Sequence, residues 1–241
     1  MCGTTRTMRV FINVNITNKP YGGSNSFFRT LTPALRKMGF KFVFDIRGKY
    51  DVALISTLHR GITIDDLAYI KSRGIPIVHR KTGYTFRGRE EMRKSVDGVV
   101  AGDRKQIEFE PYLNFSIFQS HYSHQLFLES GYRSEQCTVI PNGVDPKNFG
   151  LYDYPFGFWR QPKHREFWDS SKTFRFAIVS WSNDMRKGFK YYSDFDNELE
   201  AFPNTEVDFI GRMPDGMQFN NIRVHAPMTA TKIGKFLRTC H

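Results

Sequence analysis

The tripeptide Arg186-Lys187-Gly188 is the part of the sequence best suited to bind a charged ligand. It stands at the start of residues 188–201, whose mixed apolar and polar pattern predicts a helix. The first N–H groups of a helix have no partner within it, and they lie at the positive end of its dipole. Two cations and a glycine at this end predict a phosphate site, since glycine lets the backbone approach a ligand closely. A solvated basic turn is the alternative.

The elements that must position this tripeptide are a strand and a helix. The apolar run 174–180 predicts a buried parallel strand directly before the basic turn. The small polar residues Ser182 and Asn183 allow the chain to turn between strand and helix. The tripeptide therefore belongs to a strand-to-helix loop.

A similar unit is expected at the other end of the chain. Residues 9–15 read as a strand, residues 21–25 as a flexible turn containing Gly22 and Gly23, and residues 26–38 as an amphipathic helix. This order is the opening of a nucleotide-binding α/β unit, although the G-x-G-x-x-G pattern is incomplete. A tight turn that needs only glycine is the alternative.

Strands and helices alternate along most of the remaining sequence. Further strands are expected at 40–46, 51–56, 75–79, 114–120, 138–140, 206–210 and 222–225, and further helices at 64–72, 121–130 and 229–237 with Thr229 as N-cap. This alternation predicts an α/β protein with parallel sheets covered by helices. We expect an N-terminal Rossmann-like domain at 8–145, an aromatic-rich connection at 146–172 and a second, smaller domain at 173–241, with a cleft between the two domains.

A second basic cluster, His79-Arg80-Lys81, follows the predicted strand 75–79. Open α/β sheets bind ligands at the carboxyl ends of their strands, so this position suits a site. A histidine with only a structural role is the alternative for His79. His121 and His124 share a helix face but have no third ligand nearby, so no metal site is expected.

Charge limits the classes of partner. The 241 residues carry a net charge of +11, and residues 1–150 hold 22 Lys and Arg against 13 Asp and Glu. Such a surface suits phosphorylated substrates, an anionic membrane surface or nucleic acid. Nucleic acid is the weakest of these, because the aromatic residues fall mostly in strand-like runs and do not alternate with Lys and Arg.

The three cysteines lack the spacing of a zinc site or a disulfide framework. No apolar run approaches the roughly 18 residues of a membrane span, and residues 1–7 lack an apolar leader segment. The expected location is cytoplasmic, with peripheral contact to an anionic membrane as an option.

Five short segments together resemble the family-4 glycosyltransferases, which have the GT-B fold. They are Gly22-Gly23, Val78-His79-Arg80 with Arg87-Gly88 downstream, Phe118-Gln119-Ser120, Val139-Ile140-Pro141-Asn142-Gly143-Val144-Asp145-Pro146, and Arg186-Lys187-Gly188. They occur in the family's order across nearly the whole chain.

The resemblance implies transfer of a sugar from a nucleotide-diphosphate-sugar to a glycan or lipid-linked acceptor, with retention of configuration and without a cofactor or essential metal. Catalytic roles would fall to His79 near the reacting sugar and to Arg186 and Lys187, which would neutralise the diphosphate. The donor-binding residues would be Gly22, Gly23, Ser182, Asn183, Arg186, Lys187, Gly188 and Arg212. An ordinary surface arginine is the alternative for Arg212. Arg80 and Lys81 would lie on the acceptor side.

One family feature has no counterpart in this sequence. The family places an acidic donor-binding residue beyond a further strand of the second domain, and this sequence ends at His241 before such a segment. We therefore expect either a fragment of a longer enzyme or a natural truncation with reduced activity. A non-catalytic GT-B-like module that binds a nucleotide or a phosphorylated glycan is the alternative function.

Overall fold

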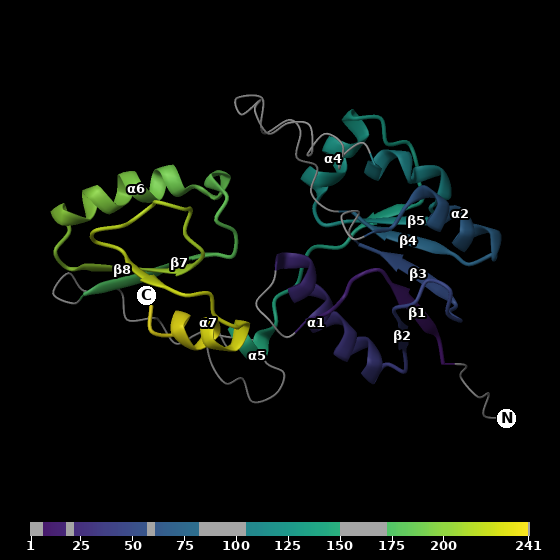
Figure 1. The fold of residues 1–241 in the computed structure, drawn as a ribbon, viewed down its shortest axis with the longest axis horizontal. Coiled ribbons are helices and arrows are strands. Elements are labelled where there is room, and N and C mark those ends of the chain that lie inside the picture. The colour runs from purple at the N-terminus through teal and green to yellow at the C-terminus, as the bar shows by residue number, and fades with distance from the viewer. Residues whose placement is uncertain (1–6, 18–21, 57–60, 82–104, 150–172, 241) are drawn as a thin grey trace. The chain divides into compact units, whose positions relative to one another are not determined.

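The computed structural model describes residues 7–17, 22–56, 61–81, 105–149 and 173–240. The chain divides into two compact units (Figure 1). Unit 1 comprises residues 1–16 and 23–143, and unit 2 comprises residues 17–22 and 144–241. Residues 150–172, most of the expected connection, lie outside the described residues.

Unit 1 is built on a six-stranded parallel sheet with the order β2-β1-β3-β4-β5-β6. Its strands are β1 (Arg9–Ile12), β2 (Lys41–Val43), β3 (Val52–Ile55), β4 (Ile77–Arg80), β5 (Phe115–Phe118) and β6 (Cys137–Val139). The order reverses between β1 and β3, since β1 connects toward β2 on one side and β3 toward β4 on the other. This reversal is the point at which open parallel sheets form a ligand crevice.

Helices cover both faces of this sheet (Figure 1). Helix α1 (Gly22–Lys37) lies on one face, and α2 (Ile64–Ser72) and α4 (His121–Glu129) lie on the other. Side chains of β1 divide accordingly, because Ile12 packs with Phe28 of α1 while Phe11 packs with Leu67 of α2. A short 3-10 helix, η2 (Glu110–Tyr112), precedes β5.

Helix α1 begins earlier than the sequence predicts. The expected flexible turn at 21–25 is wrong for residues 22–25, because Gly22, Gly23 and the two residues after them form the first turn of the helix. Tyr21 lies outside the described residues. Glycine has low helix propensity because of its backbone freedom, so the local sequence disfavours this start. Burial of Phe28 against the sheet supplies the stabilisation that local propensity lacks.

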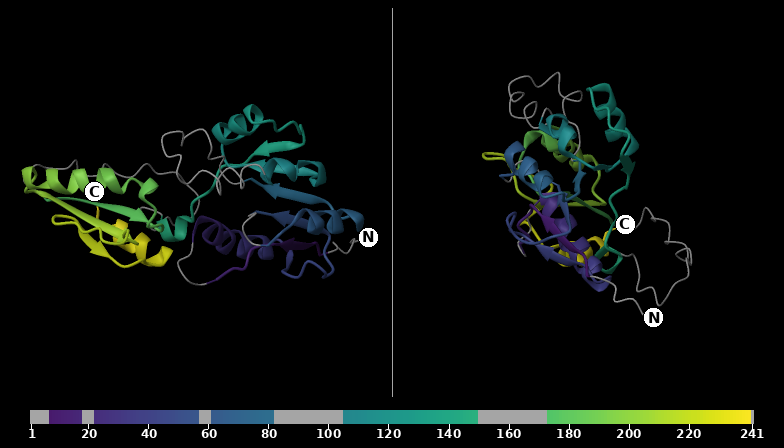
Figure 2. Two further views of the ribbon diagram at one scale, coloured as in Figure 1. Left: turned by 45° about the horizontal axis from the view of Figure 1, so that its top comes forward. Right: turned by 90° about the vertical axis from the view of Figure 1, so that its right-hand side faces the viewer.

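Unit 2 contains a three-stranded parallel sheet, β7 (Phe174–Ser180), β8 (Thr205–Gly211) and β9 (Arg223–His225), in that order. Helices α6 (Phe189–Glu198) and α7 (Ala230–Leu237) lie on opposite faces of the sheet (Figures 1 and 2). The predicted helix 188–201 is divided into α6 and the 3-10 turn η4 (Leu199–Ala201). Thr229 caps α7 as predicted, with its Oγ1 accepting from Lys232 N.

Two close contacts link elements of unit 2 that are distant in sequence. The short helix α5 (Pro146–Phe149) packs on α7, where a Cβ at Gly234 would lie 1.8 Å from the backbone oxygen of Asn148. Asp196 of α6 is buried and accepts hydrogen bonds from the backbone N–H groups of residues 220–222 at 2.7–2.8 Å. This carboxylate fixes the turn that leads into β9.

Candidate functional site

The predicted phosphate loop of unit 2 lies at the carboxyl end of β7. Ser182 Oγ accepts from Asp184 N at 3.2 Å, and its backbone oxygen accepts from Ser180 Oγ at 2.9 Å. These bonds form the turn, which continues into the 3-10 helix η3 (Met185–Lys187) and then α6. Asn183 and Lys187 are exposed. The side chain of Arg186 lies outside what the structure describes, so its predicted role stays a prediction.

Gly188 joins η3 to α6 in a left-handed conformation, with φ of +94°. It is the N-cap residue of α6 and offers no side chain to the free N–H groups that follow. No acidic residue lies in the first turn of α6. The helix start therefore keeps N–H groups and a positive dipole end for an external anion, with the Lys187 cation next to them.

Arg212, predicted on the donor side, lies at the same edge of the sheet. Its guanidinium carbon is 4.4 Å from the ring centre of Trp181, the first residue after β7. Gly211 makes this approach possible, because a Cβ there would lie 1.8 Å from the backbone oxygen of Ser180. Arg212 N donates to the same oxygen at 3.3 Å. The structure thus brings Trp181, Ser182 and Arg212 to one edge.

In unit 1, Arg80 enters a chain of polar contacts at the carboxyl edge of the sheet. Arg80 Nη2 donates to Asn142 Oδ1 at 2.6 Å, Asn142 Nδ2 donates to Gln119 Oε1 at 2.7 Å, and Gln119 Nε2 donates to Lys81 O at 2.7 Å. Arg80 Nη1 also lies 3.4 Å from Ser56 Oγ. Three loops that follow β4, β5 and β6 are therefore connected through side chains.

Arg80 and Lys81, both predicted on the acceptor side, lie in different environments. Lys81 is fully buried, its ammonium donates to Gln106 O, and the rings of Phe127 and Tyr132 lie 5.2 and 5.0 Å away. Burial lowers the Lys81 pKa to about 8, opposed by the nearby Glu110 charge. These contacts give Lys81 a structural role. Its contact with an acceptor stays a prediction.

His79 is also fully buried, and neither ring nitrogen has a hydrogen-bond partner among the described residues. Its ring lies 6.4 Å from that of Phe109, on the side of the sheet opposite Arg80. Burial, with the Lys81 charge, places the His79 pKa well below its usual value, so the ring is neutral near pH 7. Contact with a reacting sugar stays a prediction, and the ring would have to become exposed to make it.

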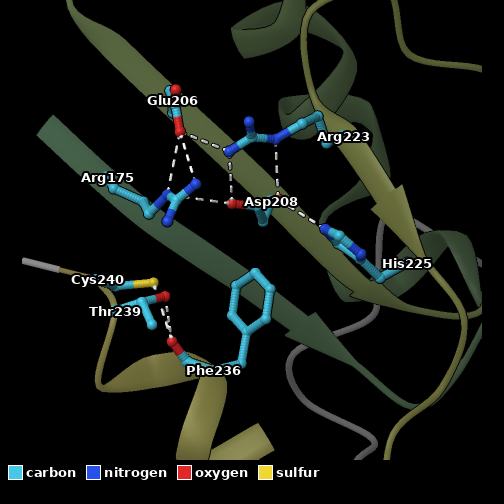
Figure 3. A network of polar contacts seen from close by, with 8 residues as sticks. All are labelled: Arg175, Glu206, Asp208, Arg223, His225, Phe236, Thr239 and Cys240. Carbon is cyan, nitrogen blue, oxygen red and sulfur yellow. Dashed lines mark hydrogen bonds and ion pairs between the residues drawn. The ribbon is translucent and has the colours of Figure 1, made fainter. Parts of the chain in front are cut away.

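A third polar cluster lies within the sheet of unit 2 (Figure 3). Asp208 is buried, and Arg223 donates to both of its oxygens at 3.1 Å while His225 Nε2 lies 2.6 Å from Oδ1. Glu206 pairs with Arg175 at 2.9 Å and with Arg223 at 2.7 Å. Burial alone would raise the Asp208 pKa, but hydrogen bonds and charge from Arg223 and His225 lower it. Each cation here faces a carboxylate.

Sequence reasoning did not single out Trp181, Ser56, Gln119 or Asn142 as site residues. Each of them follows a strand within three residues of its carboxyl end. That position was the available signal, because side chains just beyond parallel strands meet at one edge of the sheet. The pairing of Arg80 with Asn142, 62 residues later, had no signal in a single sequence.

Among the described residues, no group of three or more His, Cys, Asp or Glu side chains is arranged to hold a metal ion. In the same part of the chain, no helix has the length and apolar character needed to span a membrane.

Comparison with known proteins identifies the fold. No family model and no curated protein matches the sequence. Among solved structures, Anabaena HepE in complex with UDP and glucose matches with a TM-score of 0.56 and 15% identity, over 97% of this chain and 72% of that chain. A putative UDP-N-acetylglucosamine 2-epimerase from Listeria monocytogenes has a TM-score of 0.51 and 12% identity, over 97% and 73%.

An alpha-glucosyltransferase in complex with UDP and a 13-mer DNA matches with a TM-score of 0.54 and 12% identity, over 97% of this chain and 70% of that chain. At these identities the matches establish architecture. The chain therefore has an α/β fold of the GT-B type, with Rossmann-like parallel sheets, which nucleotide-sugar glycosyltransferases share.

Proposed function

We propose that this protein transfers a sugar from a nucleotide-diphosphate-sugar to an acceptor, and that unit 2 binds the donor. The observation that carries the proposal is the open start of α6, with its left-handed Gly188, the adjacent cation Lys187 and no acidic residue in the first turn. Similarity to HepE, whose structure contains UDP and glucose, supports the proposal.

The geometry suits a diphosphate. Free N–H groups of α6 would donate to phosphate oxygens, and Lys187 would add a positive charge beside them. The same charge would stabilise the nucleoside diphosphate as it leaves during transfer. Trp181 and Arg212 stack on each other at the same edge of the sheet. Membership of family 4, retention of configuration and a glycan or lipid-linked acceptor stay predictions from the sequence resemblance.

Donor binding can be tested by thermal unfolding with UDP, GDP and ADP. A ligand that binds the folded chain raises its melting temperature by mass action. We expect at least one of the three diphosphates to do so, and the double variant Arg186→Ala with Lys187→Ala to lose the increase. Lys235→Ala is the matched control, since Lys235 is an exposed cation of α7 and should leave the increase intact. No increase with any of the three would contradict donor binding.

Catalysis needs a separate assay, because the fold also occurs in a putative epimerase. NMR of UDP-glucose and UDP-N-acetylglucosamine incubated with the chain would follow the sugar. Release or transfer of the sugar supports a transferase, and inversion at C2 of the bound sugar supports an epimerase. Binding of a nucleoside diphosphate with neither reaction would favour the non-catalytic module, which is the alternative function.

A further inference from the structure

The guanidinium of Arg80 is a buried cation without a carboxylate partner among the described residues. Arg80 is 6% exposed. Among the described residues, its polar contacts are Asn142 Oδ1 and the longer approach to Ser56 Oγ, both neutral oxygens. Burial alone accounts for the lowering of its pKa. A buried charge that neutral groups alone solvate is costly, and an anion beside it would offset that cost.

The remaining N–H groups of Arg80 have no acceptor among the described residues. A guanidinium has five N–H donors, and two described acceptors engage two of them. Lys81 differs, because it is fully buried against a backbone oxygen and two rings.

The position of Arg80 is also that of a ligand crevice. Ser56, beside Arg80, follows β3, and its N–H donates to Asn13 Oδ1 at 3.0 Å. Asn13 follows β1, so this bond crosses the point where the strand order reverses. Arg80 also lies over the ring of Phe27, 3.8 Å from its centre, in the second turn of α1. Helix α1 has no acidic residue in its first turn, so its positive end adds to the positive charge of Arg80.

We propose that Arg80, with Ser56 and Asn142, forms an oxyanion-binding subsite in unit 1 for a carboxylate or phosphate group of the acceptor. The planar guanidinium presents paired N–H groups that match two oxygens of such a group, and the hydroxyl of Ser56 and the amide of Asn142 orient it. The assignment to the acceptor rests on the proposed function. The subsite itself rests on unit 1 alone. The proposed subsite restricts the class of acceptor to molecules that carry a carboxylate or phosphate group.

The test uses the full chain and two probes, inorganic phosphate and acetate, at constant ionic strength. Chemical shifts of the Arg80 Nε–H and the Asn142 side-chain amide should move with a saturable dependence on at least one probe. Arg80→Gln should weaken that binding at least about tenfold, the effect of losing a charge-assisted hydrogen-bond pair. Arg80→Lys should weaken it less, since the charge is kept while the paired geometry is lost.

Arg73→Gln is the matched control. Arg73 also stacks on aromatic rings and donates to two backbone oxygens, but it follows α2 at the opposite edge of the sheet. Equal weakening in both variants, or no saturable shift with either probe in the unmodified chain, would overturn the subsite. A larger response to phosphate than to acetate identifies a phosphorylated acceptor, and the reverse identifies a carboxylate.

UDP separates this proposal from the proposed function. If Arg80→Gln loses phosphate or acetate binding but keeps the UDP effect on melting temperature, the subsite belongs to a second ligand as proposed. Loss of UDP binding in Arg80→Gln would overturn the assignment to the acceptor. If the unmodified chain binds phosphate or acetate through Arg80 but no nucleoside diphosphate, the subsite stands and the donor proposal fails.

Discussion

Arginine occupies two contrasting environments in the two units. In unit 2, Arg223 contacts Asp208 and Glu206, so positive and negative charges balance within the sheet (Figure 3). In unit 1, Arg80 has only neutral partners among the described residues. A balanced cluster stabilises the fold and has little to offer a ligand. An unbalanced buried cation is stabilised by an anion from outside, so the difference separates a structural network from a binding site.

Loss of Asp208, the central carboxylate of unit 2, should cause the largest loss of stability among the substitutions considered below. Asp208→Asn would remove the buried charge to which Arg223 and His225 are hydrogen-bonded, and we expect a loss of about 3 kcal/mol of stability for unit 2. Amide hydrogen exchange at Phe209 and Ile210, both buried in β8, reports on this unit. Unchanged protection of these amides would show that the cluster is dispensable.

Acid should reduce the stability that the Asp208 carboxylate contributes to unit 2. The folded Asp208 pKa is below its ordinary value of 3.8, so its stabilisation is complete above that value. It is lost as the pH falls through the lower folded pKa. The stability advantage of the unmodified chain over Asp208→Asn should therefore persist at pH 5 and shrink below about pH 4. Denaturant unfolding across this range measures it, and an advantage that grows toward acid would contradict the assignment.

Lys81 should also make stability rise with pH, but in the alkaline range, because burial disfavours its charge. Its folded pKa, about 8, is below the ordinary 10.5, so the unfolded chain binds more protons between these values and stability rises with pH. Relative to Lys81→Met, the unmodified chain should gain about 2 kcal/mol between pH 7 and pH 10. Denaturant unfolding of both proteins measures the gain. Lys71→Met is the control, because Lys71 donates to Pro111 O at the surface, and equal behaviour of both variants would refute the burial argument.

Replacing Arg223 and Arg80 by the same residue should give a smaller difference in stability. Arg223→Met removes the two hydrogen bonds that Arg223 donates to the buried Asp208 carboxylate and should cost about 1.5 kcal/mol. Arg80→Met removes a buried cation with neutral partners and should change stability by less than about 1 kcal/mol. Denaturant unfolding at low phosphate concentration measures both. A larger loss for Arg80→Met would show that Arg80 is primarily structural.

The smallest effect concerns Arg212, which stacks on Trp181 at the donor edge. A double-mutant cycle with Trp181→Leu and Arg212→Gln should give a coupling energy of about 0.5 kcal/mol, typical of an exposed cation–π pair. Coupling near zero would show that the contact contributes nothing to the free chain. The same cycle measured with a bound nucleoside diphosphate would show whether the ligand strengthens the contact.

Local patterns were sufficient for most of the fold. The limits of α2 and β7 follow directly from apolar periodicity and, for α2, from a Thr63–Asp66 capping box. The predicted start of α1 at residue 26 was wrong, because packing of Phe28 on the sheet outweighed the low helix propensity of Gly22 and Gly23. Tertiary burial is absent from any short window of sequence.

The basic tripeptide before α6 illustrates what the sequence by itself determined. Its strand-to-helix position and the requirement for glycine at residue 188 are local, since backbone sterics set them. Only the tertiary structure showed which of Arg80 and Lys81 is suited to bind a ligand, because the two residues are adjacent in sequence and both are cationic. Alternation along the chain at the end of β4 sends their side chains to opposite faces, where Lys81 meets a closed aromatic core and Arg80 meets the neutral side chains of Ser56 and Asn142.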